Sequence, residues 1–237
     1  MLGASRQLGI RNRILDALPH DELARLLPFL EEVELRKNEI VYLTGDNIQH
    51  AYFPENGLLS LLSTTETGST VEVAMVGSEG IVGLPVILRN HRIPYEVTVQ
   101  FTTKALKIRA KELREEFDKG QALHELVLRY LNTLIAQISQ TAICHRFHLR
   151  DQALKRWLLT VQDRVNSNTL NLTQEIVSTA LGIPRTAVTK VAATMQRDGL
   201  IRYSRGKIII LDRAQLEAES CECYRIIRDE LRRFVEK

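Results

Sequence analysis

The stretch "ALGIPRTAVTK", residues 180–190, predicts that one helix ends and a second begins within a few residues. Gly182 supplies a tight turn, and Pro184 suits the first turn of a following helix, because its φ is preset and no N–H is needed there. Upstream, Thr173 is a good N-cap, and Glu175 in the first turn suits the positive end of the helix dipole. The segment is therefore predicted to be a short helix, a glycine turn and a second helix.

The second helix is predicted to have two different faces. Its inner face is apolar and consists of Val188, Val191, Ala192 and Met195. The outward residues of its first turn and a half are basic or hydroxylic: Arg185, Thr186, Thr189 and Lys190. In a helix-turn-helix, the N-terminal residues of the second helix meet base edges in the major groove. The pattern therefore favours contact with DNA.

A predicted hairpin follows in "LIRYSRGKIIIL", residues 200–211, where Ser204-Arg205-Gly206 forms the turn between two β-prone runs. We interpret it as a wing whose basic residues meet phosphates: Arg202, Arg205 and Lys207. The alternative is a helical subdomain with ordinary surface charge. Residues 150–207 hold ten Lys and Arg against four Asp and Glu, which favours nucleic acid.

Charge and composition narrow the class of protein further. Residues 145–237 carry 17 Lys and Arg against 11 Asp and Glu, whereas residues 1–144 carry 15 against 18. There is no apolar run of 18 residues and no secretory signal pattern, so we expect a cytoplasmic protein without a membrane span. Three cysteines cannot build a disulfide framework or ligate a four-cysteine iron–sulfur cluster.

Upstream of the basic part, residues 33–110 contain short β-prone runs with turn signals about every ten residues. They predict an antiparallel barrel or jelly roll. Residues 121–147 then follow a helical period, with one apolar stripe of Leu123, Val127, Tyr130, Leu134, Ile138 and Thr141, widened by Leu126, Leu131 and Ile135. A helix of about 25 residues is expected here. Its broad apolar face predicts a partner helix from a second subunit, and the alternative is packing wholly against its own chain.

At this point the chain resembles the Crp–Fnr superfamily of bacterial transcription regulators. The segments that carry the resemblance are "HAYFPENGLLSLL" (50–62), "VEVAMVGSEGIVGL" (71–84), "CHRFHLRDQALKRWLL" (144–159), "LTQEIVSTALGIPRTAVTKV" (172–191) and "DGLIRYSRGKIIILDR" (198–213). The resemblance implies an α+β protein: a cyclic-nucleotide-binding-like jelly-roll sensor at 1–118, a dimerisation helix at 119–147 and a winged helix-turn-helix DNA-binding domain at 148–237.

The resemblance also implies roles for single residues. Arg185 would be the leading base-reading arginine, facing guanine O6 and N7, and Thr173 would hold a phosphate. Family members often have glutamate at the position of Thr186 and arginine at that of Lys190. Lysine cannot form the bidentate arginine fork, so the DNA site is expected to depart from the familiar one.

The sensor departs further from the cyclic-AMP-binding members of this family. The glutamate that holds the ribose is replaced by Leu84, and the Arg-Ser pair that holds the cyclic phosphate is replaced by "IPYE" (93–96). We therefore expect no tight binding of cyclic AMP. Arginine forks suit guanine edges and phosphates, so a cyclic dinucleotide such as cyclic di-GMP is a better candidate effector than cyclic AMP. Its candidate ligands are Arg6, Arg11, Arg13, Arg89, His91 and Arg92, with plain surface arginine as the alternative.

The chain also holds residues of the types found in metal sites and in enzymes. Cys144, His145, His148, Cys221 and Cys223 are of the residue types that bind zinc, but isolated cysteine and histidine near helix ends are usually structural, so no metal is assigned. "GSEGIVG" (77–83) lacks the G-x-G-x-x-G spacing, and no catalytic arrangement is recognisable, so no enzyme is expected.

The sequence thus predicts a homodimer, joined through residues 120–147, that reads a pseudo-palindromic DNA site and responds to an effector or to a protein such as RNA polymerase or another regulator. The alternative is a nucleotide-binding signalling module that acts mainly through protein–protein contacts.

Overall fold

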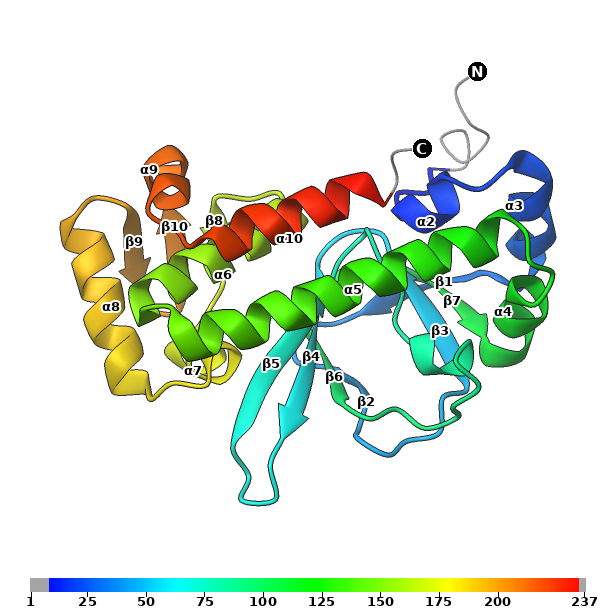
Figure 1. Cartoon of the computed structure of the whole chain (residues 1–237), viewed down its shortest axis with the longest axis horizontal. Coiled ribbons are helices and arrows are strands. Elements are labelled where there is room, and N and C mark those ends of the chain that lie inside the picture. The colour runs from blue at the N-terminus through cyan, green and yellow to red at the C-terminus, as the bar shows by residue number, and fades with distance from the viewer. Residues whose placement is uncertain (1–8, 235–237) are drawn as a thin grey trace. The chain divides into compact units, whose positions relative to one another are not determined.

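The computed structural model describes residues 9–234 (Figure 1). The chain divides into two compact units. Among the described residues, unit 1 contains 9–62, 75–135 and 230–234, and unit 2 contains 63–74 and 136–229. The sequence predicts domain boundaries at 118 and 147, whereas the packing units place residues 63–74 in unit 2 and divide the long helix after residue 135.

Unit 1 is built on antiparallel strands that form two sheets, as the turn rhythm predicts. One sheet has the order β1-β7-β3, with β1 at Glu31–Leu35, β7 at Thr103–Arg109 and β3 at His50–Pro54. The other has the order β2-β6-β4-β5, with β2 at Ile40–Tyr42, β6 at Glu96–Phe101, β4 at Leu58–Thr64 and β5 at Thr70–Val76. Alternate strand residues are buried between the sheets, among them Phe53, Val97 and Val99.

Short helices surround the strands of this unit. They are α2 (Arg13–Asp16), α3 (His20–Leu26), the 3-10 turns η1 (Leu27–Phe29) and η2 (Leu84–Val86), and α4 (Ala110–Phe117). Asn12 joins α2 to the roll. Its side-chain oxygen caps the helix by accepting from the Ile14 and Leu15 N–H groups, and its amide donates to the carbonyls of Pro54 and Gly80. A fully buried amide is thereby satisfied.

The long helix α5 spans Ala122–Phe147, 26 residues, which confirms the helix expected over 121–147 (Figure 1). Tyr130 is packed so closely on the roll that a Cβ on Gly80 would lie 2.1 Å from its hydroxyl oxygen, so only glycine fits at position 80. The predicted inner stripe needs one correction. Ile138 is 38% exposed and Ile135 is 55% exposed, and the inner face instead continues through Gln137, which is 5% exposed. The buried residues recur every 3.5 positions, as in a coiled coil, rather than every 3.6.

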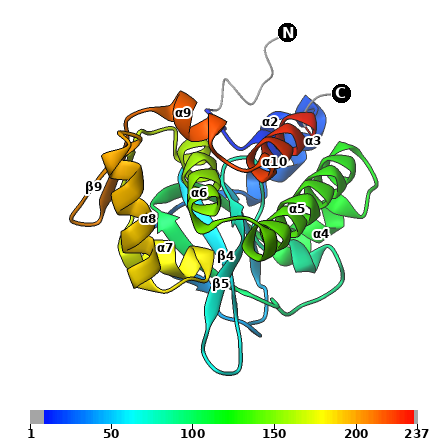
Figure 2. The same ribbon diagram turned by 60° about the vertical axis from the view of Figure 1, so that its left-hand side comes forward.

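Unit 2 contains helices and one small sheet (Figure 2). Its elements are α6 (Arg150–Val165), β8 (Thr169–Leu170), α7 (Gln174–Leu181), α8 (Arg185–Arg197), β9 (Ile201–Ser204), β10 (Lys207–Ile210), α9 (Arg213–Ala218) and α10 (Glu222–Arg233). The strands pair in the order β8-β10-β9. Fully buried Leu158, Val161, Val177, Val188 and Ile201 form the core. A winged helix-turn-helix is therefore present where the sequence predicts it.

The tip of the β4–β5 hairpin belongs to unit 2. The Trp157 indole Nε1 donates to the Glu72 carboxylate at 2.7 Å, and both side chains are buried. In the described part of the chain, no helix has both the length and the apolar character needed to cross a bilayer.

Candidate nucleic-acid interface

The first helix of the motif, α7, is fixed at both ends by its sequence. The Thr173 hydroxyl accepts from the Ile176 N–H at 3.2 Å, which satisfies one of the unpaired donors at the helix start. Gly182 ends the helix in the left-handed conformation, with φ of 62°, where a side chain would be strained. The turn that follows therefore redirects the chain at once.

Helix α8 begins directly after this turn, with Pro184 as its N-cap. Val188, Ala192 and Met195 are buried as predicted, whereas Val191 is only half-buried and Ala187, which was not predicted, is buried as well. The exposed residues at the start of the helix are those predicted to face DNA: Arg185, Thr186, Thr189 and Lys190. Short side chains at 186 and 189 leave the basic ones accessible, and the Thr189 hydroxyl donates back to the Arg185 carbonyl at 3.0 Å.

Arg185 has one ion-pair partner on the preceding helix. Its Nη2 lies 2.5 Å from Glu175 Oε1, and the two side chains are 60% and 68% exposed. An exposed ion pair of this kind contributes about 0–1 kcal/mol to stability. It therefore orients the Arg185 guanidinium but is easily broken when that group binds something else. Glu175 therefore positions the Arg185 side chain and leaves it available for another partner.

The wing is a tight hairpin. Both turn residues have positive φ, 49° at Arg205 and 76° at Gly206, as a two-residue type I′ turn requires. Three basic side chains on it are exposed: Arg202, Arg205 and Lys207. The Gln196 side chain accepts from the Tyr203 N–H at 2.7 Å, which joins the wing to the end of α8.

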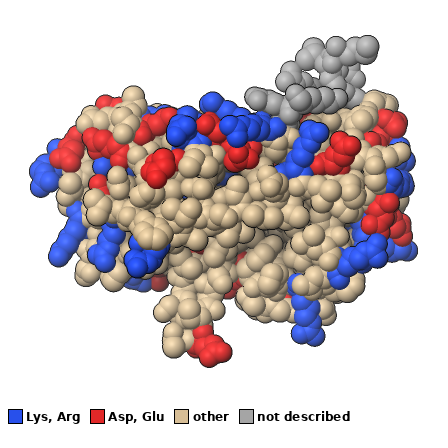
Figure 3. Space-filling view, in the orientation of Figure 1, with Lys and Arg blue, Asp and Glu red and all other residues tan. Residues whose placement is uncertain are grey.

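A groove of about 490 Å³ lies where α7, α8 and the wing meet. It brings together Thr173, Arg185 and Arg205, which the sequence selects separately. Figure 3 shows basic side chains on the side of the unit where α8 lies. The groove is thus open, polar and edged by cations.

Five groove residues are not among the predicted DNA contacts: Gln174, Glu175, Tyr203, Ser204 and Gly206. Each is adjacent in sequence to a selected residue or to another groove residue, and the Gln174 amide and the Ser204 hydroxyl are suited to phosphate oxygens. The Tyr203 hydroxyl is buried and has no hydrogen-bond partner among residues 9–234, and burial raises its pKa.

The segment of the roll that corresponds to the cyclic-AMP-binding positions of the family is apolar in this chain. Gly83 has a φ of 99°, and Leu84, Pro85 and Val86 are all buried. Proline has no N–H to offer a phosphate. In "IPYE", Ile93 is buried, and the Glu96 carboxylate accepts from the Thr98 hydroxyl at 2.8 Å. These positions offer neither an arginine nor a ribose-binding carboxylate.

The candidate effector arginines have partners in different segments. Arg6 lies outside the described residues. The Arg13 guanidinium lies over the Phe234 ring at 5.4 Å, while Arg11 donates its backbone N–H to Glu55. On the other stretch, Arg89 forms a long ion pair with Asp118 at 3.9 Å.

The remaining two candidates, His91 and Arg92, are exposed next to Arg89. Arg92 pairs with Asn47 through an isolated backbone bridge.

Comparison with known proteins gives two family matches. A model described as the cyclic nucleotide-binding domain matches residues 32–119, and a model described as the Crp-like helix-turn-helix domain matches residues 152–219. The transcriptional regulator LdrP of Thermus thermophilus is 24% identical over 200 residues, which cover 78% of this chain and 94% of LdrP.

Solved structures share the fold. A CRP-family transcriptional regulator from Thermus thermophilus has a TM-score of 0.68 at 21% identity, and the match covers 79% of this chain and 96% of that one. The c-di-GMP-responsive global regulator CLP of Xanthomonas campestris has a TM-score of 0.68 at 14% identity, and the match covers 82% and 100%. Both domain models match in the expected order, and the described fold agrees with them. This chain therefore belongs to the Crp–Fnr superfamily and is a DNA-binding transcription regulator of that kind.

Proposed function

We propose that the protein acts as a homodimer that reads a pseudo-palindromic DNA site under the control of an effector other than cyclic AMP. The observation that carries this proposal is the exposed start of α8, where Arg185 and Lys190 project beside a basic wing. We expect no catalytic activity, and we expect the protein to work where the chromosome is, in the cytoplasm.

Dimerisation is supported by an apolar seam along α5. We define the seam as Leu128, Leu131, Ile135, Ile138 and Ala142, which are spaced alternately by three and four residues. Leu128 is 43% exposed, and Ile135 and Ile138 are exposed as given above. Such a 3–4 repeat is the pattern that packs against an equivalent helix in a coiled coil. The seam would therefore be covered by the same seam of a second subunit.

Two recognition helices related by a two-fold axis would enter successive major grooves about 34 Å apart. Arg185 would read a guanine, and the wing cations and the start of α7 would hold phosphates. Contacts with RNA polymerase or another regulator would then convert occupancy into a change in transcription.

The direct experiment measures binding of fluorescent duplexes, first selected from genomic fragments, as a function of salt. Arg185→Ala should lose about 1–3 kcal/mol of discrimination against a mismatched site. Arg197→Ala is the matched control, because Arg197 is an exposed arginine at the far end of the same helix. Equal loss in both variants, or no binding by the wild type at low salt, would favour the protein-binding alternative.

For the effector, we propose a cyclic dinucleotide over cyclic AMP. The buried Leu84 and Pro85 and the Glu96 carboxylate oppose a cyclic monophosphate at the usual position. The fold itself accommodates a response to c-di-GMP, since the structurally similar CLP is described as responsive to it. Calorimetry with both nucleotides tests this. Submicromolar binding of cyclic AMP would contradict it.

A further inference from the structure

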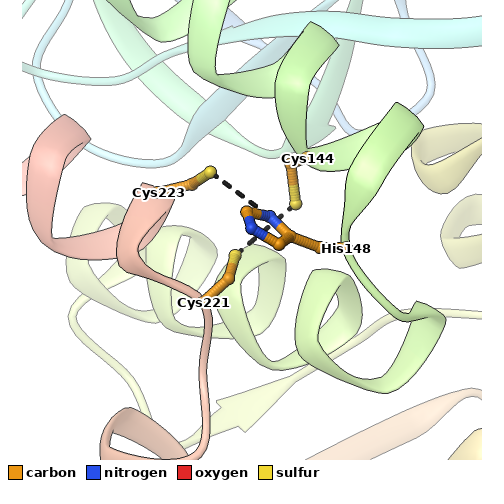
Figure 4. Close-up of side chains that lie close together, drawn as sticks. All are labelled: Cys144, His148, Cys221 and Cys223. Atoms are coloured by element: carbon orange, nitrogen blue, oxygen red, sulfur yellow. Dashed lines mark hydrogen bonds between the residues drawn. The ribbon is translucent and has the colours of Figure 1, made fainter.

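Four side chains from two segments of unit 2 converge on one point: Cys144, His148, Cys221 and Cys223 (Figure 4). Their ligand atoms all lie within 4.8 Å of one another. All three cysteines are buried and His148 is half-buried. The recognition motif and the nucleotide segment use none of these residues.

Local structure explains how the residues meet. Cys144 lies in the last turn of α5, and the His148 N–H donates to the Cys144 carbonyl at 3.2 Å, so the two side chains are one helical turn apart. Cys221 and Cys223 flank Glu222 at the start of α10. The end of α5 therefore supplies a Cys-x3-His pair, and the start of α10 supplies a Cys-x-Cys pair. Cys144 and Cys221 are 77 residues apart in the sequence.

The distances suit one tetrahedral ion. Cys144 Sγ lies 3.6 Å from Cys221 Sγ, and Cys223 Sγ lies 3.6 Å from His148 Nδ1. A Zn–S bond of about 2.3 Å places two tetrahedral sulfurs about 3.8 Å apart. An iron–sulfur cluster is itself several ångströms across and would hold its ligands further apart than these atoms lie.

The surroundings supply what a zinc site needs. The ring nitrogen of His148 that faces away from Cys223, Nε2, lies 3.2 Å from the Glu222 carboxylate. A carboxylate that accepts the Nε2–H leaves Nδ1 free to ligate, which is the carboxylate–histidine–zinc arrangement.

Charge compensation is present as well. Three thiolates around Zn²⁺ leave one net negative charge, which calls for a cation nearby. Arg156 is 2% exposed, its Nε has no hydrogen-bond partner among the described residues, and its charge acts on Cys144.

The geometry points to a structural Cys3His zinc site that fastens the start of α10 to the end of α5. Tetrahedral coordination by three sulfurs and one nitrogen, with no open position, is typical of zinc that stabilises a fold rather than catalyses a reaction. Binding releases the thiol protons as Zn²⁺ replaces them. The sequence names these residues as possible zinc ligands but assigns no metal, because isolated cysteine and histidine near helix ends are usually structural.

The test uses the full-length protein, purified anaerobically and passed through gel filtration, with zinc and iron measured by mass spectrometry. The wild type should hold one zinc per chain, and Cys223→Ser and His148→Gln should hold little. His20→Gln, which alters an exposed histidine outside the cluster, should match the wild type. Equal zinc in Cys223→Ser and wild type would overturn the proposal.

Stripping the wild type with a chelator and reloading it with Co²⁺ avoids dependence on the folding of any variant. Tetrahedral d–d bands together with thiolate-to-cobalt charge-transfer absorption would support the site. Glu222→Gln should weaken Zn²⁺ binding about 10–100-fold in a chelator competition, since it removes the carboxylate behind His148. No metal uptake by the reduced protein, iron with acid-labile sulfide, or a Cys144–Cys221 disulfide in the anaerobic protein would each overturn it.

Discussion

The seam on α5 gives a prediction whose size can be worked from the exposed surface. We consider the double variant Ile135→Ala/Ile138→Ala. The two side chains are 55% and 38% exposed in the single chain, so together they offer nearly the surface of one whole isoleucine per subunit. Fully burying an isoleucine contributes about 1.5–3 kcal/mol, which is about 3–6 kcal/mol over two subunits.

Alanine retains its Cβ, so we expect a net loss of about 2–4 kcal/mol in dimerisation free energy. This corresponds to a dimer dissociation constant raised about 30- to 1,000-fold. The folded subunit should be almost unaffected, because both side chains are largely exposed and alanine is the better helix former.

Sedimentation equilibrium over a dilution series measures the dissociation constant, and circular dichroism checks the helix content. Leu211→Ala is the control, because Leu211 is 51% exposed and lies outside the seam, directly after β10. A double variant that dimerises as tightly as the wild type would refute the role of the seam, as would a wild type that is monomeric at micromolar concentration.

Three further changes test other parts of the structure. Trp157→Phe should destabilise unit 2 by about 1.5–3 kcal/mol in urea unfolding, because it leaves the buried Glu72 carboxylate without its indole donor; an unchanged midpoint would mean that this bond contributes nothing net. Thr173→Ala should cost about 1 kcal/mol through loss of the α7 cap, whereas Thr173→Ser should retain it; equal unfolding midpoints for the two variants would count against the cap. Burial raises the pKa of Glu116, but hydrogen bonds from Arg25 and Lys119 outweigh burial and lower that pKa overall. The stability that these bonds add is therefore present above the pKa of Glu116 in the unfolded chain. It is lost as the pH falls through the pKa of Glu116 in the folded chain. Glu116→Gln should therefore be less stable than the wild type at pH 7, and the gap should close in acid; a gap that persists below about pH 3 would contradict this.

The recognition motif could be predicted from the sequence because its determinants are local. Thr173, Gly182 and Pro184 act within a few residues of their own position, as cap, turn and helix start. Once both helices are placed, the exposed face at Arg185 follows from the period of the helix.

The predicted inner face of α5 was wrong at Ile135 and Ile138 for a physical reason, although Thr141 is buried as predicted. The apolar stripe drawn at 3.6 residues per turn leads to Ile138, whereas the buried face continues at Gln137, whose side-chain oxygen accepts from Arg164. A polar residue buried with a partner from another helix carries no hydrophobic signal in its own sequence. The two isoleucines that the sequence places inside, Ile135 and Ile138, are exposed instead, and they belong to the seam that we propose for dimerisation.

Contacts between distant segments were also beyond the sequence. The bond between Trp157 and Glu72 joins residues 85 positions apart. The pairing of Cys144 with Cys221 depends on where two helix ends meet, which no periodicity encodes.

The most direct test of the central claim is selection of binding sites from a pool of random duplexes with the wild-type protein, followed by sequencing. We predict a motif with two-fold symmetry, half-sites centred about 10–10.5 base pairs apart, and a guanine in each half that Arg185→Ala no longer requires. Enrichment of an unsymmetrical motif, or of no motif at all, would contradict the account of a dimer that reads DNA through the start of α8.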